Sequence, residues 1–287
     1  MTATSPTTLV LAATGKTGRR VVSGLEARDL PVRIGSRRAE PPFDWQDDTT
    51  WAPALHGVDA AYVAFYLDAA FPGAAEVVRS FAGMAVAGGV RHLVLLADRG
   101  SAEAQRCEQA VRDSGAEWTI VRAGFITQNF SEAFLVELVR AGVVALPAGE
   151  VAEPFTDAED IADVAVAALT GNGHAGRIHE VTGPRLLTFA DAVGEIARQA
   201  GRQVRYLPVT QEQFVSSLTA RGVPAGYATQ LAGLMVEVFD GRRATVTDTV
   251  ARVLGRPARD FTEYARETAA TGVWDTRTPS SGAGGGR

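Results

Sequence analysis

Lysine is nearly absent from this chain: of its 28 basic residues, only Lys16 is a lysine. Any catalytic motif that needs a lysine later in the chain is therefore excluded. Cysteine is equally scarce. The single Cys107 cannot form an internal disulfide, and one cysteine fits a reducing cytoplasm. Cys107 falls in step with Ala104 and Val111 on a predicted helix, so we expect a small core residue.

Long apolar and long basic segments are also missing. No apolar run approaches the ~20 residues that span a bilayer, and residues 1–8 hold neither a basic segment nor a hydrophobic core, so we expect no secretory signal. Basic residues form doublets at most and the net charge is −5, which argues against nucleic acid. Four scattered histidines lack the spacing of metal ligands. We expect a cytoplasmic monomer or homodimer whose partner is a small-molecule substrate, with no metal, nucleic acid or membrane.

What the chain does contain is a strand–turn–helix–strand pattern between residues 8 and 38. An apolar run at 9–13 predicts a strand, a turn of small residues follows at 14–18, and 31–34 predicts a second strand after a helix. A dinucleotide fingerprint requires this context. A pyrophosphate is attracted by unpaired N–H groups and the helix dipole, and glycines let it approach the backbone.

The glycine pattern departs from that fingerprint at its first position. Read as G-x-G-x-x-G, it places Ala13, Gly15 and Gly18 at the glycine positions. Read as G-x-x-G-x-x-G, it places Ala12 first instead. Either way the first glycine is an alanine, and an ordinary glycine-containing turn remains the alternative.

The end of the second strand indicates which dinucleotide is preferred. NAD sites carry an acid about 20 residues after the glycines, which binds the ribose 2′-OH. Here the chain reads Gly35-Ser36-Arg37-Arg38, and a guanidinium suits a 2′-phosphate. We therefore expect NADP(H) to be preferred, with NAD(H) possible; the alternative is two solvated arginines in a loop.

Further strands are predicted at 60–65, 91–97 and 117–122, each separated from the next by a helix. This alternation predicts an α/β fold with a Rossmann-type doubly wound parallel sheet. Ligands bind at the carboxyl ends of such strands. We expect a Rossmann core over 8–127 and a smaller, mostly helical substrate lobe over 128–275, from which the chain returns to the core sheet. Residues 1–7 and 276–287 are expected to be disordered.

The chain resembles the NmrA-like, atypical short-chain dehydrogenase/reductase family from about residue 9 to 265. The resemblance rests on several segments in order: LAATGKTGRRV, FDWQDDTTWAPALHGVDAAYV, GVRHLVLLADRG, SGAEWTIVRAGFITQNF, PFTDAEDIADVAVAALTG and GRQVRYLPV. It is most similar to the branch that holds ergot-alkaloid iminium reductases and quinone oxidoreductase-like enzymes.

The resemblance implies a cofactor site along the strand ends. The glycine turn would cradle the pyrophosphate, Arg37 would bind the 2′-phosphate, and Asp44 and Trp45 would lie near the adenine. The nicotinamide side would be flanked by Phe65, Ala97 and the turn after residue 122. The full candidate set is Ala13, Thr14, Gly15, Lys16, Thr17, Gly18, Ser36, Arg37, Asp44, Trp45, Phe65, Ala97, Ala123, Gly124 and Phe125. Phe65 and Trp45 have core packing as their alternative.

The scarcity of lysine bears on the chemistry. Relatives in the wider superfamily use Tyr-x-x-x-Lys to move a proton, which is impossible here because Lys16 comes too early. Where many relatives have Leu-Leu-Ser-Ser-Arg-Gly, this chain has Ala97 and Asp98 in place of the serines. The catalytic candidates are Asp98 and Tyr66; Asp98 has helix capping as its alternative, and Tyr66 has pocket lining.

These features favour an NADP(H)-dependent reductase that transfers hydride to a small, electron-poor acceptor such as an iminium, quinone or enone, in secondary metabolism. Two alternatives remain. One is an NADP(H)-sensing regulator without turnover, and the other is a non-redox biosynthetic enzyme on the same fold. The helical residues Leu234, Met235 and Phe239 are expected to be core rather than pocket.

Overall fold

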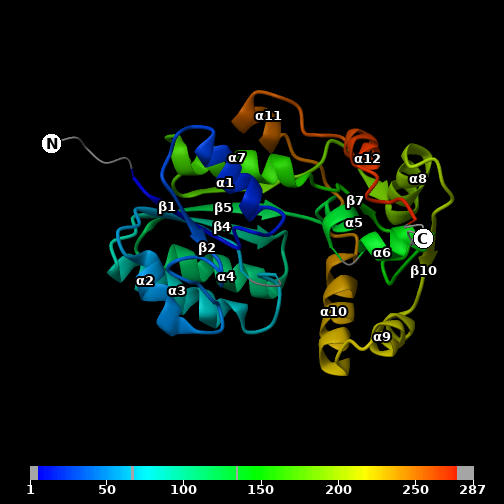
Figure 1. The fold of residues 1–287 in the computed structure, drawn as a ribbon, viewed down its shortest axis with the longest axis horizontal. Coiled ribbons are helices and arrows are strands. Elements are labelled where there is room, and N and C mark those ends of the chain that lie inside the picture. The colour runs from blue at the N-terminus through cyan, green and yellow to red at the C-terminus, as the bar shows by residue number, and fades with distance from the viewer. Residues whose placement is uncertain (1–5, 66–67, 134, 277–287) are drawn as a thin grey trace, which may run out of the picture.

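The computed structural model describes residues 6–65, 68–133 and 135–276. Its centre is a parallel sheet in the order β2-β1-β3-β4-β5-β8 (Figure 1). The strands are β1 (Thr8–Leu11), β2 (Val32–Gly35), β3 (Ala60–Val63), β4 (His92–Asp98), β5 (Glu117–Ala123) and β8 (Arg177–Val181). The first five lie within two residues of the predicted bounds. The chain runs outward from β1 to β2 and then crosses back to β3, so the sheet's topological switch point lies between β1 and β3.

Helices cover both faces of this sheet, which makes the predicted α/β Rossmann-type architecture correct. One face carries α1 (Gly18–Glu26), α7 (Ala158–Thr170) and α11 (Thr249–Leu254). The other carries α2 (Trp51–Leu55), preceded by the 3-10 turn η1 (Asp48–Thr50), together with α3 (Ala74–Ala87) and α4 (Ala102–Arg112). Strand residues buried on both faces explain the continuous apolar runs in the sequence. Cys107 is fully buried on α4, as expected.

After β5 the chain enters a separate lobe with its own apolar core. The lobe contains α5 (Asn129–Glu132), α6 (Leu135–Arg140), β6 (Val143–Leu146), β7 (Ala152–Glu153), β9 (Leu187–Thr188), α8 (Phe189–Gln199), β10 (Arg205–Pro208), α9 (Gln211–Ala220), α10 (Ala225–Val238) and α12 (Phe261–Ala270). Strands β6 and β10 pair in parallel, and β7 pairs antiparallel with β9. The lobe's amphipathic helices bury their apolar faces against one another.

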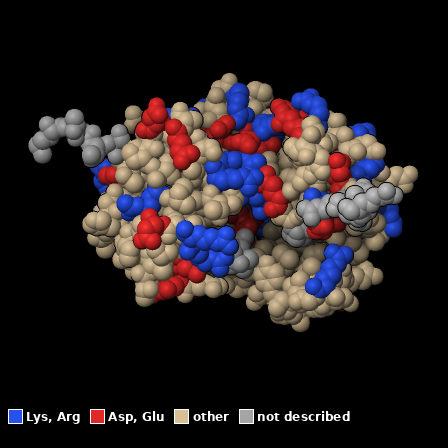
Figure 2. Space-filling view, in the orientation of Figure 1, with Lys and Arg blue, Asp and Glu red and all other residues tan. Residues whose placement is uncertain are grey.

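The chain passes between the core and the lobe more than once. It leaves the core after β5, returns through α7 and β8, re-enters the lobe with β9 and α8, and comes back once more as α11. The carboxyl ends of β3, β4 and β5 therefore face the lobe (Figure 1). Figure 2 shows the surface hollowed at this junction, with positive and negative side chains interspersed around it. In the described part of the chain, no helix is long and apolar enough to cross a membrane.

Candidate active site

The turn after β1 folds tightly against the start of α1. Ala12 has a left-handed backbone with φ of 49°, and its carbonyl oxygen accepts a hydrogen bond from the Gly15 amide at 2.8 Å. A Cβ on Gly18 would lie 2.1 Å from the same oxygen, so α1 can begin here only with a glycine. The backbone thus uses the spacing Ala12, Gly15, Gly18, the second of the two alternatives read from the sequence.

The amino end of α1 is suited to an anion. The residue before the helix, Thr17, makes no capping hydrogen bond through its side chain. The amides of Arg19 and Arg20 donate to the carbonyl oxygens of Gly15 and Thr17, both at 3.1 Å, so the amides just before them in the turn are the ones placed for a ligand. Lys16 lines a cavity beside this turn. Burial lowers the pKa of Lys16, and the carboxylates of Glu132 and Asp68 oppose that effect. These residues fit a pyrophosphate group.

The first turn of α1 is also fixed to the lobe. The Arg20 guanidinium donates to the Lys16 carbonyl oxygen at 2.7 Å and to Glu159 of α7 at 2.6 Å. It also reaches Glu132 of α5 at 3.0 Å, and Arg19 pairs with the same carboxylate at 2.5 Å. The arginine doublet at 19–20 therefore joins three helices around the turn, and this contact orients the predicted phosphate site.

The end of β2 presents two arginines to solvent. Arg37 and Arg38 are both exposed, and among the residues that the structure describes neither guanidinium has an ion-pair partner. The preceding Ser36 holds the loop in shape, since its carbonyl oxygen accepts from the Phe43 amide at 2.9 Å. An exposed guanidinium without an ion-pair partner is available to bind a phosphate group, which is the role that the sequence predicts for Arg37.

The loop after β2 packs by its aromatic rings rather than lying open. Trp45 donates its indole N–H to the Ala64 carbonyl oxygen at 3.2 Å. Its ring centroid lies 5.0 Å from that of Phe65 and 5.1 Å from that of Phe43. The neighbouring Asp44 bonds within its own loop, accepting from the Gln46 amide at 3.0 Å. The packing alternative for Trp45 is therefore realised, and its ring supports the end of β3.

A cavity of about 510 Å³ lies where the glycine turn, the ends of β3, β4 and β5, and the lobe meet. On the core side, the cavity is lined by residues at the carboxyl ends of β1, β3, β4 and β5, where ligand binding is predicted, but not by the end of β2. The lobe contributes one long apolar wall. The residues that line the cavity include Gly15, Lys16, Thr17, Phe65, Asp68, Phe71, Ala97, Asp98, Ala123, Gly124, Phe125, Tyr227, Leu231, Leu234, Met235, Val238 and Phe239.

Two carboxylates face this cavity from the ends of adjacent strands. Asp98, the last residue of β4, is held by an ion pair with Arg243 at 3.1 Å and accepts from the Ser101 amide at 3.0 Å. Burial raises the pKa of Asp98, and Arg243 opposes the rise. Asp68 follows β3, and its side chain is exposed and lines the cavity. Desolvation by the protein packed around its carboxyl group and the negative charge of Asp98 raise the pKa of Asp68 to about 6.

Behind these carboxylates lies a buried charged layer. Arg99 donates to Glu180 of β8 at 2.9 Å and to the carbonyl oxygens of Arg243 and Thr245 at 3.1 and 3.2 Å. Glu153 of β7 is fully buried, and neither of its oxygens has a hydrogen-bond partner among the described residues. Burial raises the pKa of Glu153 to about 7, although Arg99 and Arg243 oppose this. The layer anchors residues 240–247 of the lobe to the core sheet.

The wall opposite the strand ends is apolar. Helix α10 contributes Leu231, Leu234, Met235 and Val238, and Phe239 follows at its carboxyl end. The expectation that residues 234, 235 and 239 are core rather than pocket is incomplete, because all three line the cavity while Met235 and Phe239 also pack into the lobe core. The side chains of these three residues therefore lie at the boundary between the cavity and the lobe core.

Aromatic rings extend this apolar surface at two further points. Phe125, which begins the chain's passage into the lobe, lies 5.7 Å from the Phe239 ring, centroid to centroid. Phe71 of the core stacks on Tyr227 of α10, with centroids 5.9 Å apart and ring planes 14° apart. This stack bridges the core and the lobe beside the cavity. An apolar, flat molecule would meet favourable surface on this side.

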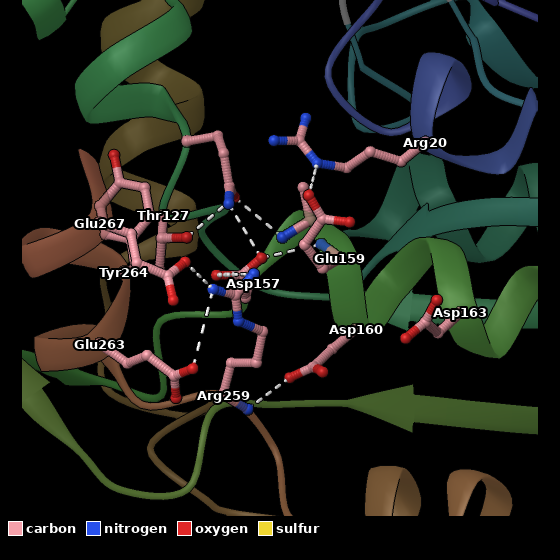
Figure 3. A network of polar contacts seen from close by, with 12 residues as sticks. Arg20, Thr127, Asp157, Glu159, Asp160, Asp163, Arg259, Glu263, Tyr264 and Glu267 are labelled. Carbon is pink, nitrogen blue, oxygen red and sulfur yellow. Dashed lines mark hydrogen bonds and ion pairs between the residues drawn. The ribbon is translucent and has the colours of Figure 1, made fainter. Parts of the chain in front are cut away.

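A polar network fixes the lobe on α7 (Figure 3). Asp157 begins α7 and accepts from the Gln128 amide group at 2.9 Å. Its other carboxylate oxygen lies 3.8 Å from the Arg259 guanidinium. Arg259 also donates its backbone N–H to Asp160 at 2.8 Å and pairs with Glu267 of α12. Acids that the sequence shows at a helix start therefore also tie α12 to the core.

The structure brings most, but not all, of the predicted site residues to the cavity. Gly15, Lys16, Thr17, Phe65, Ala97, Asp98, Ala123, Gly124 and Phe125 line it. The other cofactor candidates lie along the turn and the loop after β2, outside the cavity lining: Ala13, Thr14, Gly18, Ser36, Arg37, Asp44 and Trp45. Tyr66 lies outside the described residues. For Asp98 the capping alternative is realised at Ser101, in addition to its place on the cavity wall.

Sequence reasoning missed Asp68 and Arg243. A signal for Asp68 was present, because it follows a buried strand at the edge where ligands bind. Arg243 gave no signal: it lies 145 residues from its partner Asp98, in one of several arginine doublets that form no basic stripe.

Two family models match the chain. The NmrA-like family model matches residues 102–265, and a model described as NAD(P)H-binding matches residues 12–172. Each covers more than half of the chain, and together they span the cavity-lining residues of both the core and the lobe.

Individual relatives match nearly the whole length. An NAD(P)H azoreductase of Xenophilus azovorans is 33% identical, over 91% of this chain and 98% of the relative. A (4-alkanoyl-5-oxo-2,5-dihydrofuran-3-yl)methyl phosphate reductase of Streptomyces griseus is 34% identical, over 91% and 97%. Among solved structures, an NADPH-dependent quinone oxidoreductase of Escherichia coli in complex with NADPH superimposes with a TM-score of 0.76 at 22% identity, covering 91% of this chain and 99% of that one.

Proposed function

This chain belongs to the NmrA-like family and is an NAD(P)H-dependent oxidoreductase, and on that premise we propose that it reduces a small, apolar, electron-poor acceptor held in the cavity between core and lobe. NADP(H) is the preferred cofactor in this proposal. The observation that carries it is the continuity of the cavity, which joins the turn at α1 to an apolar wall on α10.

The glycine turn and Lys16 would hold the cofactor's pyrophosphate, and the exposed Arg37 its 2′-phosphate. The cofactor then extends along the strand ends, past Phe65 and Ala97, towards the Gly124 turn. Bound NADPH supplies a hydride from its nicotinamide ring. The protein's own contribution is to place the acceptor against that ring and to exclude water.

The wall opposite the strand ends sets the class of acceptor. Leu231, Leu234 and Phe239 present apolar surface, and Phe125 adds an aromatic face. Such a wall suits an unsaturated or aromatic molecule better than a sugar or an amino acid. Relatives named for azo compounds and for an oxo-dihydrofuran support an acceptor with a conjugated double bond. The iminium, quinone and enone classes all fit this description, and a role in secondary metabolism is part of the proposal.

The test is anaerobic mixing of purified protein with NADPH and a panel of acceptors: quinones, cyclic iminium ions, azo compounds and unsaturated lactones. Oxidation of NADPH is followed by the loss of its absorbance, and the product is identified by mass. We expect turnover with at least one class, and faster turnover with NADPH than with NADH. If cofactor binds saturably but no acceptor is reduced, the function proposed here is wrong and a cofactor-sensing regulator is the better explanation.

The regulator alternative gains no specific observation from the site. A sensor needs the dinucleotide cradle alone, whereas here the same cavity continues from the glycine turn to an apolar wall on α10. The whole cavity has a volume of about 510 Å³, which falls in the range of ligand pockets. The apolar wall at its far end favours a second ligand beside the cofactor.

A further inference from the structure

We propose that Asp68 is the catalytic acid of this enzyme, delivering to the reduced acceptor the proton that balances the hydride, while Asp98 and Arg243 set the charge around it. The proposal rests on the reductase function proposed above, and it assigns a residue to the proton transfer that accompanies the hydride transfer. It also predicts which acceptors need that residue and which do not.

The first ground is position. Asp68 lies five residues beyond the end of β3, at the sheet's switch point, and lines the same cavity as Lys16 of the glycine turn and Asp98 of β4. A carboxyl group in that place is within the compartment that holds the acceptor. Lys16 itself is committed to the phosphate turn, and no second lysine exists anywhere in the chain.

The second ground is how the two carboxylates are held. Asp98 is fully engaged: both of its oxygens contact Arg243, at 3.1 and 3.3 Å, and one also accepts from the Ser101 amide. Asp68 has one oxygen bound by the Ala70 amide at 2.9 Å. Its other oxygen has no hydrogen-bond partner among the described residues and is open to the cavity. The carboxylate of Asp98 is thus occupied by its partners, whereas one oxygen of Asp68 is left for a ligand in the cavity.

The third ground is the charge that surrounds Asp68. Its side chain is exposed to the cavity. Desolvation by the protein around its carboxyl group disfavours the ionised form first, and the negative charge of Asp98 adds to that effect, so its pKa rises to about 6. Lys16 and Arg243 act in the opposite direction. Cys107 of α4 also faces it, but burial raises the pKa of that thiol to about 12, so the thiol stays neutral. A carboxyl group with a pKa near 6 can exchange a proton near neutral pH.

A neutral acceptor with a conjugated double bond takes a hydride from NADPH at one end and a proton from Asp68 at the other. The double bond becomes single, the O–H bond of Asp68 breaks, and the resulting carboxylate regains a proton from water through the cavity mouth. A cationic iminium takes only the hydride and becomes a neutral amine, so it does not need Asp68.

The decisive experiment compares these two acceptor classes in Asp68→Asn. We expect kcat with a quinone or unsaturated lactone to fall by about 10²-fold or more, while kcat with a cyclic iminium changes less than about threefold. Asp68→Glu should recover part of the loss. Asp113→Asn, an exposed change at the end of α4, serves as the control and should leave both rates unchanged.

The pH profile supplies a second readout. For wild-type protein and a neutral acceptor, kcat/KM should be constant at low pH and fall about tenfold per unit above the pKa of Asp68. Asp68→Asn should lose this limb. Asp98→Asn should move the limb to lower pH, since it removes the negative charge beside Asp68 and releases Arg243.

A third readout needs no turnover. Infrared difference spectra of the cofactor-free protein, titrated through about pH 6, should contain a protonated-carboxyl band that is missing in Asp68→Asn. The proposal fails if that variant reduces neutral acceptors at the wild-type rate and with the wild-type pH limb. If instead wild-type protein reduces no acceptor of either class, the reductase function itself fails, so the two failures are distinguishable.

Discussion

Replacing Ala12 by glycine should stabilise this protein, although it removes a methyl group. The residue sits in the left-handed region with φ of 49°, where a Cβ crowds the following carbonyl at a cost of roughly 1–2 kcal/mol. Glycine removes that cost, but it also gives the unfolded chain more freedom, which offsets about 0.4–1 kcal/mol. The expected net gain is about 0.5–1 kcal/mol.

Thermal and urea unfolding measure this gain directly. In a chain of this size, 1 kcal/mol raises Tm by roughly 2–4 °C, so Ala12→Gly should melt about 1–4 °C higher. The matched control is Ala13→Gly, at a buried position that does not share the left-handed backbone. It should lose about 0.5–1 kcal/mol. Equal destabilisation by both changes would refute the left-handed turn and, with it, the register Ala12, Gly15, Gly18.

Three further outcomes follow from the geometry. Gly18→Ala places a Cβ 2.1 Å from a carbonyl oxygen, so NADPH binding measured by calorimetry should weaken at least about tenfold. The control is Gly83→Ala, in open space on α3, which should raise the free energy of unfolding by about 1 kcal/mol. Arg37→Asp should weaken NADPH about 10- to 100-fold, from the loss of roughly 1.5–3 kcal/mol of charged hydrogen bonding, and leave NADH nearly unchanged; equal losses for both would remove the assignment. Because the pKa of buried Glu153 is about 7, against 4.5 ordinarily, its contribution to stability is present below about pH 4.5 and is lost as pH rises to about 7. Glu153→Gln should abolish this loss of roughly 2–4 kcal/mol between about pH 4.5 and 7. Urea unfolding at several pH values that shows the same pH dependence of stability for both proteins would contradict it.

Much of the core could be predicted because local signals and the sheet agree. Continuous apolar runs such as 60–63 mark strands covered on both faces, and the carboxyl ends of those strands form the cavity rim, as the rule for parallel sheets requires. Asp98 could be nominated for the same reason. Asp68 obeys the rule equally well, but the charges that act on it, those of Lys16, Asp98 and Arg243, are distant in sequence.

The side-chain arrangement of the site could not be predicted. The periodicity of apolar residues shows that one face of a helix is apolar, but it does not show whether that face packs against a core or lines a cavity. Leu234 and Met235 have the spacing of a core stripe, yet they border a cavity as well as the lobe core. The ion pair between Asp98 and Arg243 joins segments 145 residues apart. Likewise, two histidines that looked scattered, His174 and His179, lie in hydrogen-bond contact at 2.9 Å, because a turn folds one ring back onto β8.

The late position of β8 in the sequence has a consequence for how the protein folds during its synthesis. Its pairing with β5 requires residues 177–181, which a ribosome delivers only after the lobe's first helices. Until then, the outer edge of β5 carries unpaired backbone groups and is a template for another chain. A chain cut near residue 150 would be expected to aggregate rather than to bind dinucleotide. We therefore expect that neither of the two halves that line the cavity can be excised as a working module.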